Sequence, residues 1–126
     1  MPARLRPADP AEVAAALTRL DASAGAGEKP DRADLRLLTK HFLALLEERA
    51  PGRSVEVRVP PFAAVQVVEG VRHTRGTPPA VVETDASTWI ALATGATTWE
   101  QVLAEGRATA SGERTDLAPY LPLLEA

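Results

Sequence analysis

The stretch "VVETDASTWIALATGATTWEQVLAEGRATASG", residues 81–112, decides the fold. Its apolar beginning predicts a strand over residues 80–84. Asp85 has the carboxylate that commonly caps a helix N-terminus, so we expect a helix over residues 87–94. Gly95 can adopt the left-handed conformation that ends such a helix. The first half of the stretch is therefore a strand followed by a short helix.

A second short helix and another strand complete the stretch. Thr97 with Glu100 has the spacing of a capping box, and we expect the helix that it begins to end at Gly106. Small residues then alternate over residues 106–112, between two glycines, which predicts a further strand. Residues 80–112 are therefore predicted to form a strand, two short helices and a second strand, in that order.

Two more strands precede this unit. The sequence "SVEVRV" alternates, with Val55, Val57 and Val59 on one face, which is typical of a half-buried strand. Pro60-Pro61 interrupts it, because neither residue has an N–H group for a ladder. The segment "FAAVQVVEG", residues 62–70, is more apolar, and we expect it to be a central strand.

A helix is predicted near the N-terminus, where Asp9 can cap it and Pro10 suits the first helical position. Glycine, serine and proline in residues 21–30 predict a linker. The helix carries a thin, alanine-rich apolar stripe and needs a surface to lie on, either the second helix or a partner. The stripe consists of Val13, Ala16, Leu17 and Leu20.

The second helix is the clearest element in the sequence. Asp31 can cap it, and Pro51-Gly52 ends it. Apolar residues recur at the helical spacing between these ends. They are Leu35, Leu38, Phe42, Leu45 and Leu46.

These elements predict an α+β protein. Short turns between neighbouring strands favour a mainly antiparallel sheet, with helices covering one face. We divide the chain into residues 1–30, an N-terminal helix and linker, and residues 31–126, the rest of one compact domain. The last twelve residues, 115–126, have leucines at helical spacing. Because Pro122 lacks the N–H group that a helix interior needs, we expect a short, irregular helix there.

Composition excludes several classes of function. The net charge of −3 offers no basic field for nucleic acid. There is no cysteine, which removes disulfides and thiolate catalysis and fits a cytoplasmic location. No apolar run has the length of a membrane span, so we expect no integral membrane association. We find no nucleophile elbow and no phosphate-binding loop, and we expect no cofactor and no metal.

The ordered set "W..LATG", "GR" and "SG", within residues 53–124, resembles the sterol carrier protein type 2 family. Residues 59–85 are similar to a bacterial, chiefly actinobacterial, subgroup. A related module forms the C-terminal part of mycothiol-dependent maleylpyruvate isomerases. The resemblance implies a five-stranded sheet, with its fifth strand from residues 71–77, and an apolar tunnel between sheet and helices that accepts lipids.

Large apolar side chains allow two interpretations. They either pack as an ordinary core, which is the commoner use of such residues, or form the wall and lid of a lipid tunnel. The sequence does not separate the two. The predicted wall consists of Phe62, Val65, Val67, Trp89, Leu92, Val102, Leu103, Leu117 and Leu121.

A cationic cluster is the clearest candidate for a polar site. Arg72, His73 and Arg75 can bind the phosphate or carboxylate head group of a ligand, or a protein partner. The alternative is a solvated hairpin whose arginines form weak surface ion pairs. His41 lacks a second metal ligand at suitable spacing, so we interpret it as a structural histidine.

We therefore expect a non-enzymatic protein that binds or transfers a lipid or another apolar small molecule. A second hypothesis is a protein-interaction module with a filled core, acting through residues 72–75. A third, an accessory role in the chemistry of small thiol conjugates, has the least support. Ligand identity and oligomeric state do not follow from the sequence.

Overall fold

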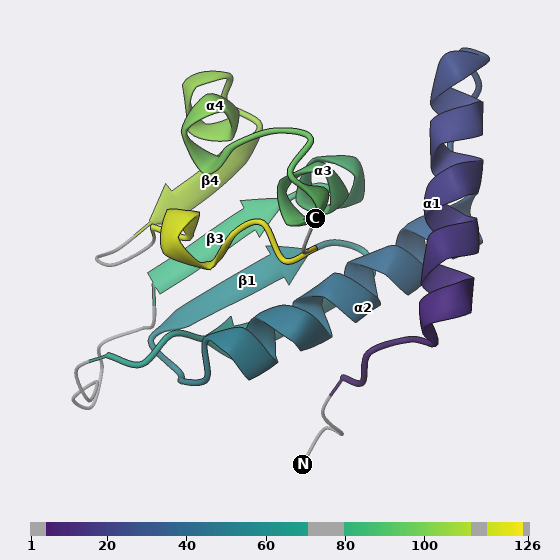
Figure 1. The fold of residues 1–126 in the computed structure, drawn as a ribbon. Coiled ribbons are helices and arrows are strands. Elements are labelled where there is room, and N and C mark those ends of the chain that lie inside the picture. The colour runs from purple at the N-terminus through teal and green to yellow at the C-terminus, as the bar shows by residue number, and fades with distance from the viewer. Residues whose placement is uncertain (1–4, 71–79, 112–115, 125–126) are drawn as a thin grey trace.

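The computed structural model describes residues 5–70, 80–111 and 116–124 (Figure 1). Two helices come first, followed by a sheet whose last two strands are separated by two short helices. The elements are α1 (Pro10–Gly25), α2 (Arg32–Arg49), β1 (Val55–Val59), β2 (Ala63–Val67), β3 (Ala80–Thr84), α3 (Ala86–Thr94), α4 (Trp99–Ala104), β4 (Ala108–Ser111) and the 3-10 helix η1 (Ala118–Tyr120).

The described part of the sheet has four strands in the order β2-β1-β3-β4. β1 pairs antiparallel with β2, and β3 pairs antiparallel with β4. β1 and β3 pair in parallel, with Val57 opposite Val82. β2 therefore runs opposite to both β1 and β3. The sheet is therefore mixed, and β2 lies at an edge of the described sheet rather than at its centre as predicted.

The predicted fifth strand, over residues 71–77, lies outside the described residues. The four described strands otherwise follow the sequence-based boundaries closely. Alternation and proline placed β1, β2 and β3 because each has one buried face, whereas β4, with only Ala108 buried, was placed by its flanking glycines.

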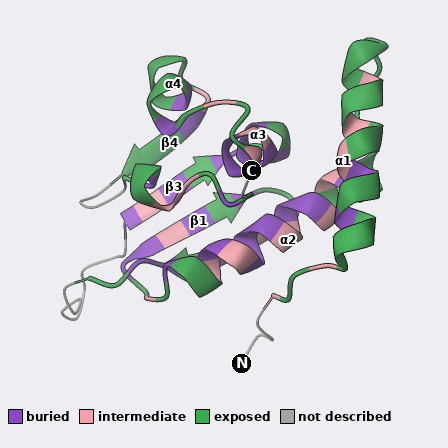
Figure 2. Cartoon of the chain, viewed as in Figure 1, coloured by how far each residue is buried: buried purple, intermediate pink, exposed green. Residues whose placement is uncertain are grey.

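Helices cover one face of the sheet, as expected. Val55, Val57 and Val59 on the inner face of β1 are each 0% exposed. α2 and α3 lie over this face and contact each other (Figure 1). On the opposite face, Arg58 and Glu83 are exposed. Figure 2 shows the resulting alternation of buried and less buried residues along β1 and β3.

Side-chain caps set the beginnings of the helices. Asp9 accepts from the amides of Ala11 and Glu12, and Asp31 accepts from Ala33 and Asp34. These two caps and the Asp85 cap of α3 were predicted correctly. Gly95 ends α3 with a φ of 86°, as expected.

Two helix boundaries were predicted wrongly. α1 continues to Gly25, so residues 21–25 belong to the helix and not to the linker. Alanine-rich sequence extends a helix that is already nucleated, because each added residue gains a hydrogen bond at little entropic cost. Thr98, not Thr97, caps α4 and accepts from the amide of Gln101 at 3.1 Å. Trp99, 5% exposed, is thus the first residue of that helix.

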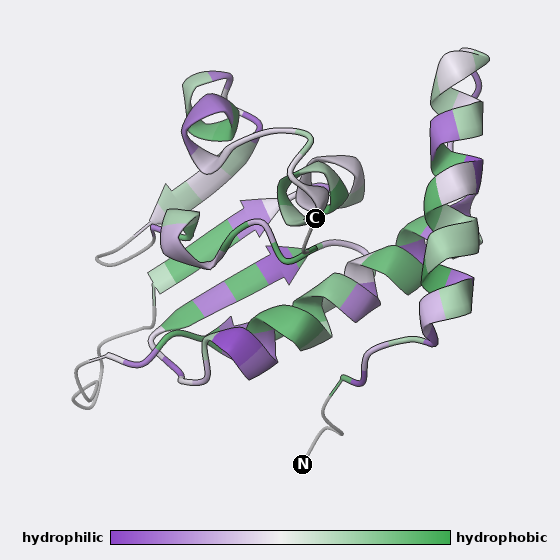
Figure 3. Cartoon of the chain, viewed as in Figure 1, coloured by the Kyte–Doolittle hydropathy of each residue, from purple (hydrophilic) through white to green (hydrophobic). Residues whose placement is uncertain are grey.

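α1 packs across α2 (Figure 1). Val13 and Ala16 are buried, while Leu17 and Leu20 are half-buried against the core. The thin stripe therefore lies on the second helix, one of the two predicted surfaces. Figure 3 shows the alternation of hydrophobic and hydrophilic residues along both helices.

Within residues 116–124, the described part of the chain after β4, there is one 3-10 turn, η1, and no further helix. Leu117 and Leu123 are buried, whereas Leu124 is 38% exposed. The buried leucines therefore do not follow the helical spacing that the sequence predicted. Pro119 and Pro122 cannot donate the amide hydrogens that a continuing helix needs.

Candidate functional site

A layer of apolar side chains fills the space between the sheet and helices α2 and α3, and we call it the apolar layer. The sheet contributes the inner faces of β1, β2 and β3, and α3 contributes Trp89 and Leu92. The facing side of α2 consists of Leu38, Phe42 and Leu46, each 0% exposed. The sequence identified these α2 residues only as a helix stripe, although they form one whole side of the layer.

Most residues of the predicted tunnel wall belong to this layer. Six are buried in one continuous cluster, and Phe62 and Leu121 are partly buried against it. Leu103 differs, because 42% of it is exposed on α4. The six buried residues are Val65, Val67, Trp89, Leu92, Val102 and Leu117.

Trp89 belongs to the layer and is 0% exposed. Its indole Nε1 donates to the backbone oxygen of Thr39 on α2 at 3.3 Å. The Thr39 hydroxyl is itself buried and has no hydrogen-bond partner among the described residues. A buried hydroxyl without a partner loses the hydrogen bonds that it makes to water. It is thus a buried polar group beside the largest side chain of the apolar layer.

Residues 116–124, which we call the C-terminal segment, lie across the helix-covered side of the protein (Figure 1). Leu117 and Leu123 insert into the apolar layer. The amides of Leu123 and Leu124 donate to the backbone oxygen of Ala93 at 2.8 and 3.1 Å. These contacts attach the segment to the end of α3.

Arg49, at the end of α2, holds the other side of the C-terminal segment. Its Nη1 donates to the backbone oxygens of Tyr120 at 3.2 Å and Pro122 at 2.7 Å. The sequence analysis missed this role, because a side chain that binds backbone oxygens 71 and 73 residues away leaves no local pattern. The segment therefore closes the layer through a few hydrogen bonds and two leucines.

The predicted cationic site, Arg72, His73 and Arg75, lies outside the described residues. It stays a prediction.

His41 has a structural contact, as interpreted from the sequence. Its Nδ1 accepts a hydrogen bond from the amide of Ala8 at 2.9 Å, and its ring meets Phe42 edge-on. Burial lowers the pKa of His41, with a smaller opposing effect from Glu48. The neutral imidazole that accepts this hydrogen bond is therefore favoured.

A hollow on the surface, which we call the β3–β4 pocket, lies at the end of β3 where β4 begins. Its volume is about 340 Å³, and it opens to solvent. It is lined by Pro60 and by residues 83–85 and 106–109. None of the predicted wall residues lines it. The lining residues include Glu83, Asp85 and Arg107, and also Ala108, which belongs to the buried cluster.

Within residues 5–70, 80–111 and 116–124, no group of three or more His, Asp or Glu residues is arranged to hold a metal ion. In the same ranges, no helix combines the length and hydropathy needed to cross a bilayer.

Comparison with known protein families shows the family of this chain. A family model described as "Bacterial SCP ortholog" matches residues 31–123. The chain belongs to this family, the bacterial sterol carrier protein-like proteins. The match confirms the resemblance seen in the sequence and includes the apolar layer, while α1 precedes it. It says nothing of the maleylpyruvate isomerases, so that link stays a prediction. No curated protein matches the chain.

Proposed function

We propose that this protein binds a lipid or another apolar ligand, without changing it chemically, in the apolar layer between the sheet and α2 and α3. Membership of the SCP family supports a lipid-binding role. Burial supplies the driving force, at about 0.8 kcal/mol for each methylene group removed from water. The layer is the described region with enough apolar surface to do this.

One observation carries the proposal further. The C-terminal segment fills part of the layer with Leu117 and Leu123, yet it is attached by few hydrogen bonds. Displacing two leucines exposes apolar surface that an acyl chain can cover instead. The exchange conserves burial, so its cost is small compared with opening a helix or a strand. We propose that ligand uptake occurs by this displacement.

The two tryptophans of the chain allow a direct test. Trp99→Phe leaves Trp89, which is fully buried in the layer, as the only indole. A fatty acid brominated in mid-chain quenches an indole only at contact range. We expect saturable quenching of Trp89 with one fatty acid per protein. The unbrominated fatty acid is the control for a conformational effect on fluorescence.

Native mass spectrometry of the protein purified from its own host gives a second measurement. A stoichiometric lipid adduct supports the carrier function and identifies the ligand class. A clean apo mass, together with no quenching of Trp89, contradicts it. That pair of results favours the alternative, an interaction module with a filled core that acts through residues 72–75.

We also propose that Arg72, His73 and Arg75 bind the ligand's head group, on the strength of arginine's affinity for carboxylates and phosphates. The double variant Arg72→Ala, Arg75→Ala is expected to weaken binding of a fatty acid about tenfold. Binding of the fatty alcohol of equal length is expected to stay unchanged. Equal affinities of both ligands for variant and wild type exclude a head-group role.

A further inference from the structure

Thr39 is a polar residue on the face of α2 that covers the sheet. It lies three positions before Phe42 and seven before Leu46, so the helical period of about 3.6 residues places all three on one side. Like them, Thr39 is 0% exposed. The indole of Trp89 on α3 donates to its backbone oxygen at 3.3 Å. The side chain of Thr39 therefore lies inside the apolar layer.

The Thr39 hydroxyl differs from the other buried polar groups. Five polar side chains are buried within residues 5–70, 80–111 and 116–124. Four of them have a hydrogen-bond partner in the protein: Asp34, Ser54, Thr84 and Thr88. The hydroxyl of Thr39 has none in the same ranges. Such a hydroxyl weakens folding, whereas valine, which has nearly the same shape, would fill the position without this cost.

A ligand in the layer can supply the missing partner. This step rests on the proposed function, in which an acyl chain replaces Leu117 and Leu123. A plain alkyl chain leaves the Thr39 hydroxyl without a partner. A chain that carries a hydroxyl or keto oxygen beside Thr39 forms a hydrogen bond there, in place of the one that this oxygen loses from water. The layer therefore accepts an oxygen at this one point better than elsewhere.

The geometry of α2 gives the position of that oxygen along the chain. Arg49, which holds the C-terminal segment, lies ten residues after Thr39 on the same helix. At about 1.5 Å per residue, the two are roughly 15 Å apart along the helix axis. An extended alkyl chain advances about 1.25 Å per carbon, given ordinary C–C bond lengths and angles. A chain that enters at the C-terminal segment and runs along α2 thus brings roughly its twelfth carbon to Thr39.

We propose that the apolar layer selects an acyl chain with a hydroxyl or keto oxygen near its middle, and that Thr39 recognises this oxygen. The probe is 12-hydroxystearic acid, whose hydroxyl lies at the expected carbon. Stearic acid is the same chain without the hydroxyl. In 2-hydroxystearic acid the hydroxyl lies beside the head group, so this acid is the control for position.

Competition measures the preference. In the Trp99→Phe variant, each acid is titrated against a fatty acid brominated in mid-chain, and recovery of Trp89 fluorescence gives its affinity. The quantity compared is the affinity for 12-hydroxystearic acid divided by that for stearic acid. We expect Thr39→Val to lower this ratio about tenfold or more, because the ligand hydroxyl is then buried without a partner. Effects on folding and entry cancel in the ratio, since the two acids share their length and head group.

Two further substitutions serve as controls. Thr39→Ser keeps the hydroxyl and should keep the ratio. Thr88→Val removes a buried hydroxyl next to Trp89 that already donates to Asp85 at 2.9 Å, so it should also leave the ratio unchanged. If Thr39→Val does not fold, Thr39→Ala removes the same hydroxyl and is compared with Thr39→Ser.

The outcomes separate this inference from the proposed function. No saturable quenching of Trp89 by the brominated acid overturns both. Saturable quenching, with a ratio that Thr39→Val changes by less than about twofold, overturns only the role of Thr39 and leaves lipid binding standing. An equal loss of affinity for 2-hydroxystearic acid in Thr39→Val also overturns the proposal, because recognition would then not depend on where the hydroxyl lies.

Discussion

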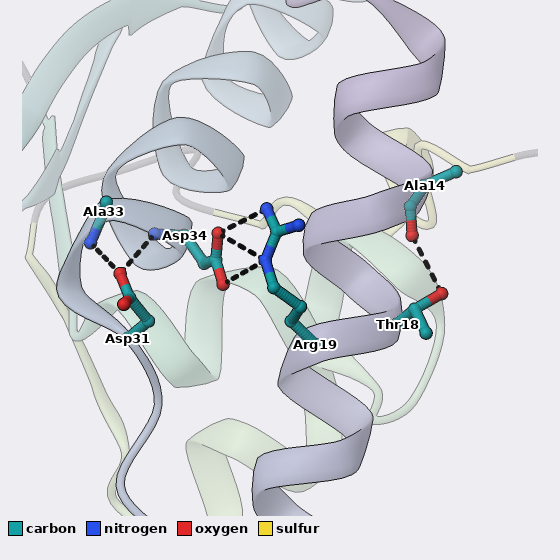
Figure 4. Close-up of polar contacts among 6 residues, drawn as sticks. All are labelled: Ala14, Thr18, Arg19, Asp31, Ala33 and Asp34. Atoms are coloured by element: carbon teal, nitrogen blue, oxygen red, sulfur yellow. Dashed lines mark hydrogen bonds and ion pairs between the residues drawn. The ribbon is translucent and has the colours of Figure 1, made fainter.

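The guanidinium of Arg19 in α1 donates to both carboxylate oxygens of Asp34 in α2, over distances of 2.8–3.2 Å (Figure 4). Asp34 is buried, with 7% of its surface exposed, whereas the Arg19 side chain is 59% exposed. The SCP family match begins at residue 31, so this contact joins α1 to the part of the chain that the family defines. It fixes the crossing of the two helices at one point.

Removing this contact should loosen α1. Arg19→Ala leaves the Asp34 carboxylate buried without its main partner, which costs more than the loss of an ordinary surface ion pair. We expect a lower midpoint of thermal unfolding and faster amide exchange in α1 than in α2. Arg36→Ala, an exposed arginine on α2, is the control. Equal effects of the two substitutions would show that the contact does not stabilise the protein.

The same contact predicts an acid dependence. The hydrogen bonds from Arg19 lower the pKa of Asp34 below its ordinary value of 3.8, although burial opposes them. The unfolded carboxyl therefore takes up a proton at higher pH than the folded one. The stabilisation is present above about pH 3.8 and is lost as the pH falls through the lowered pKa. Unfolding in urea between pH 6 and pH 2 measures it, and Asp34→Asn should remove this part of the dependence.

The N-terminal segment before α1 should respond to pH nearer neutrality. Burial lowers the pKa of His41 from its ordinary value of 6.5, so folding favours the neutral ring. Its contribution to stability is complete above about pH 6.5 and declines as the pH falls below that value. A protonated ring cannot accept from the amide of Ala8. We expect the Ala8 amide to exchange faster at pH 5 than at pH 7, after correction for intrinsic exchange.

The matched control is His41→Gln, whose side-chain oxygen can accept the same bond but does not titrate. Its corrected Ala8 exchange should be the same at both pH values. A dependence that persists in this variant would assign the effect to another group.

Gly52 should tolerate no side chain. Its φ is 152°, and a Cβ atom there would lie 2.2 Å from the backbone carbon and oxygen of Val68. That oxygen accepts from both the amide and the hydroxyl of Ser54, which limits its movement. We expect Gly52→Ala to destabilise the protein by about 3 kcal/mol, the upper end for forced overpacking. Chemical denaturation measures the change.

Gly27 provides the comparison for Gly52. Its φ is 69°, but nothing lies within 4 Å of an added Cβ. Gly27→Ala should therefore cost only the backbone strain, about 1 kcal/mol. Similar losses for the two substitutions would mean that the close approach to Val68 is not limiting.

Arg49 should control how fast an apolar ligand binds. Arg49→Ala removes both bonds to the C-terminal segment and leaves Leu117 and Leu123 in place. We expect uptake of a fluorescent fatty acid to be several times faster in stopped-flow measurements, with little change in core stability. Arg53→Ala, an exposed arginine just after α2, is the control. An unchanged rate would show that the segment does not gate uptake.

The sequence by itself determined the local elements. Asp9, Asp31 and Asp85 marked helix starts, because a short acidic side chain satisfies free amides only at that position. Alternating valines defined β1 and its buried face, since the strand period of two leaves no other arrangement. The order of "LATG", "GR" and "SG" was enough to indicate the family. Each cap and each alternating run is contained within a few residues, and the family motifs all lie within residues 89–112.

Only the tertiary structure decided what depends on distant contacts. The parallel pairing of β1 with β3 and the edge position of β2 follow from how the whole chain is routed. The bonds from Arg49 to the C-terminal segment, and the meeting of residues 83–85 with 106–109 around a pocket, join positions 21 to 73 residues apart. Local propensity does not encode such contacts, because the free energy that selects them comes from packing the complete fold.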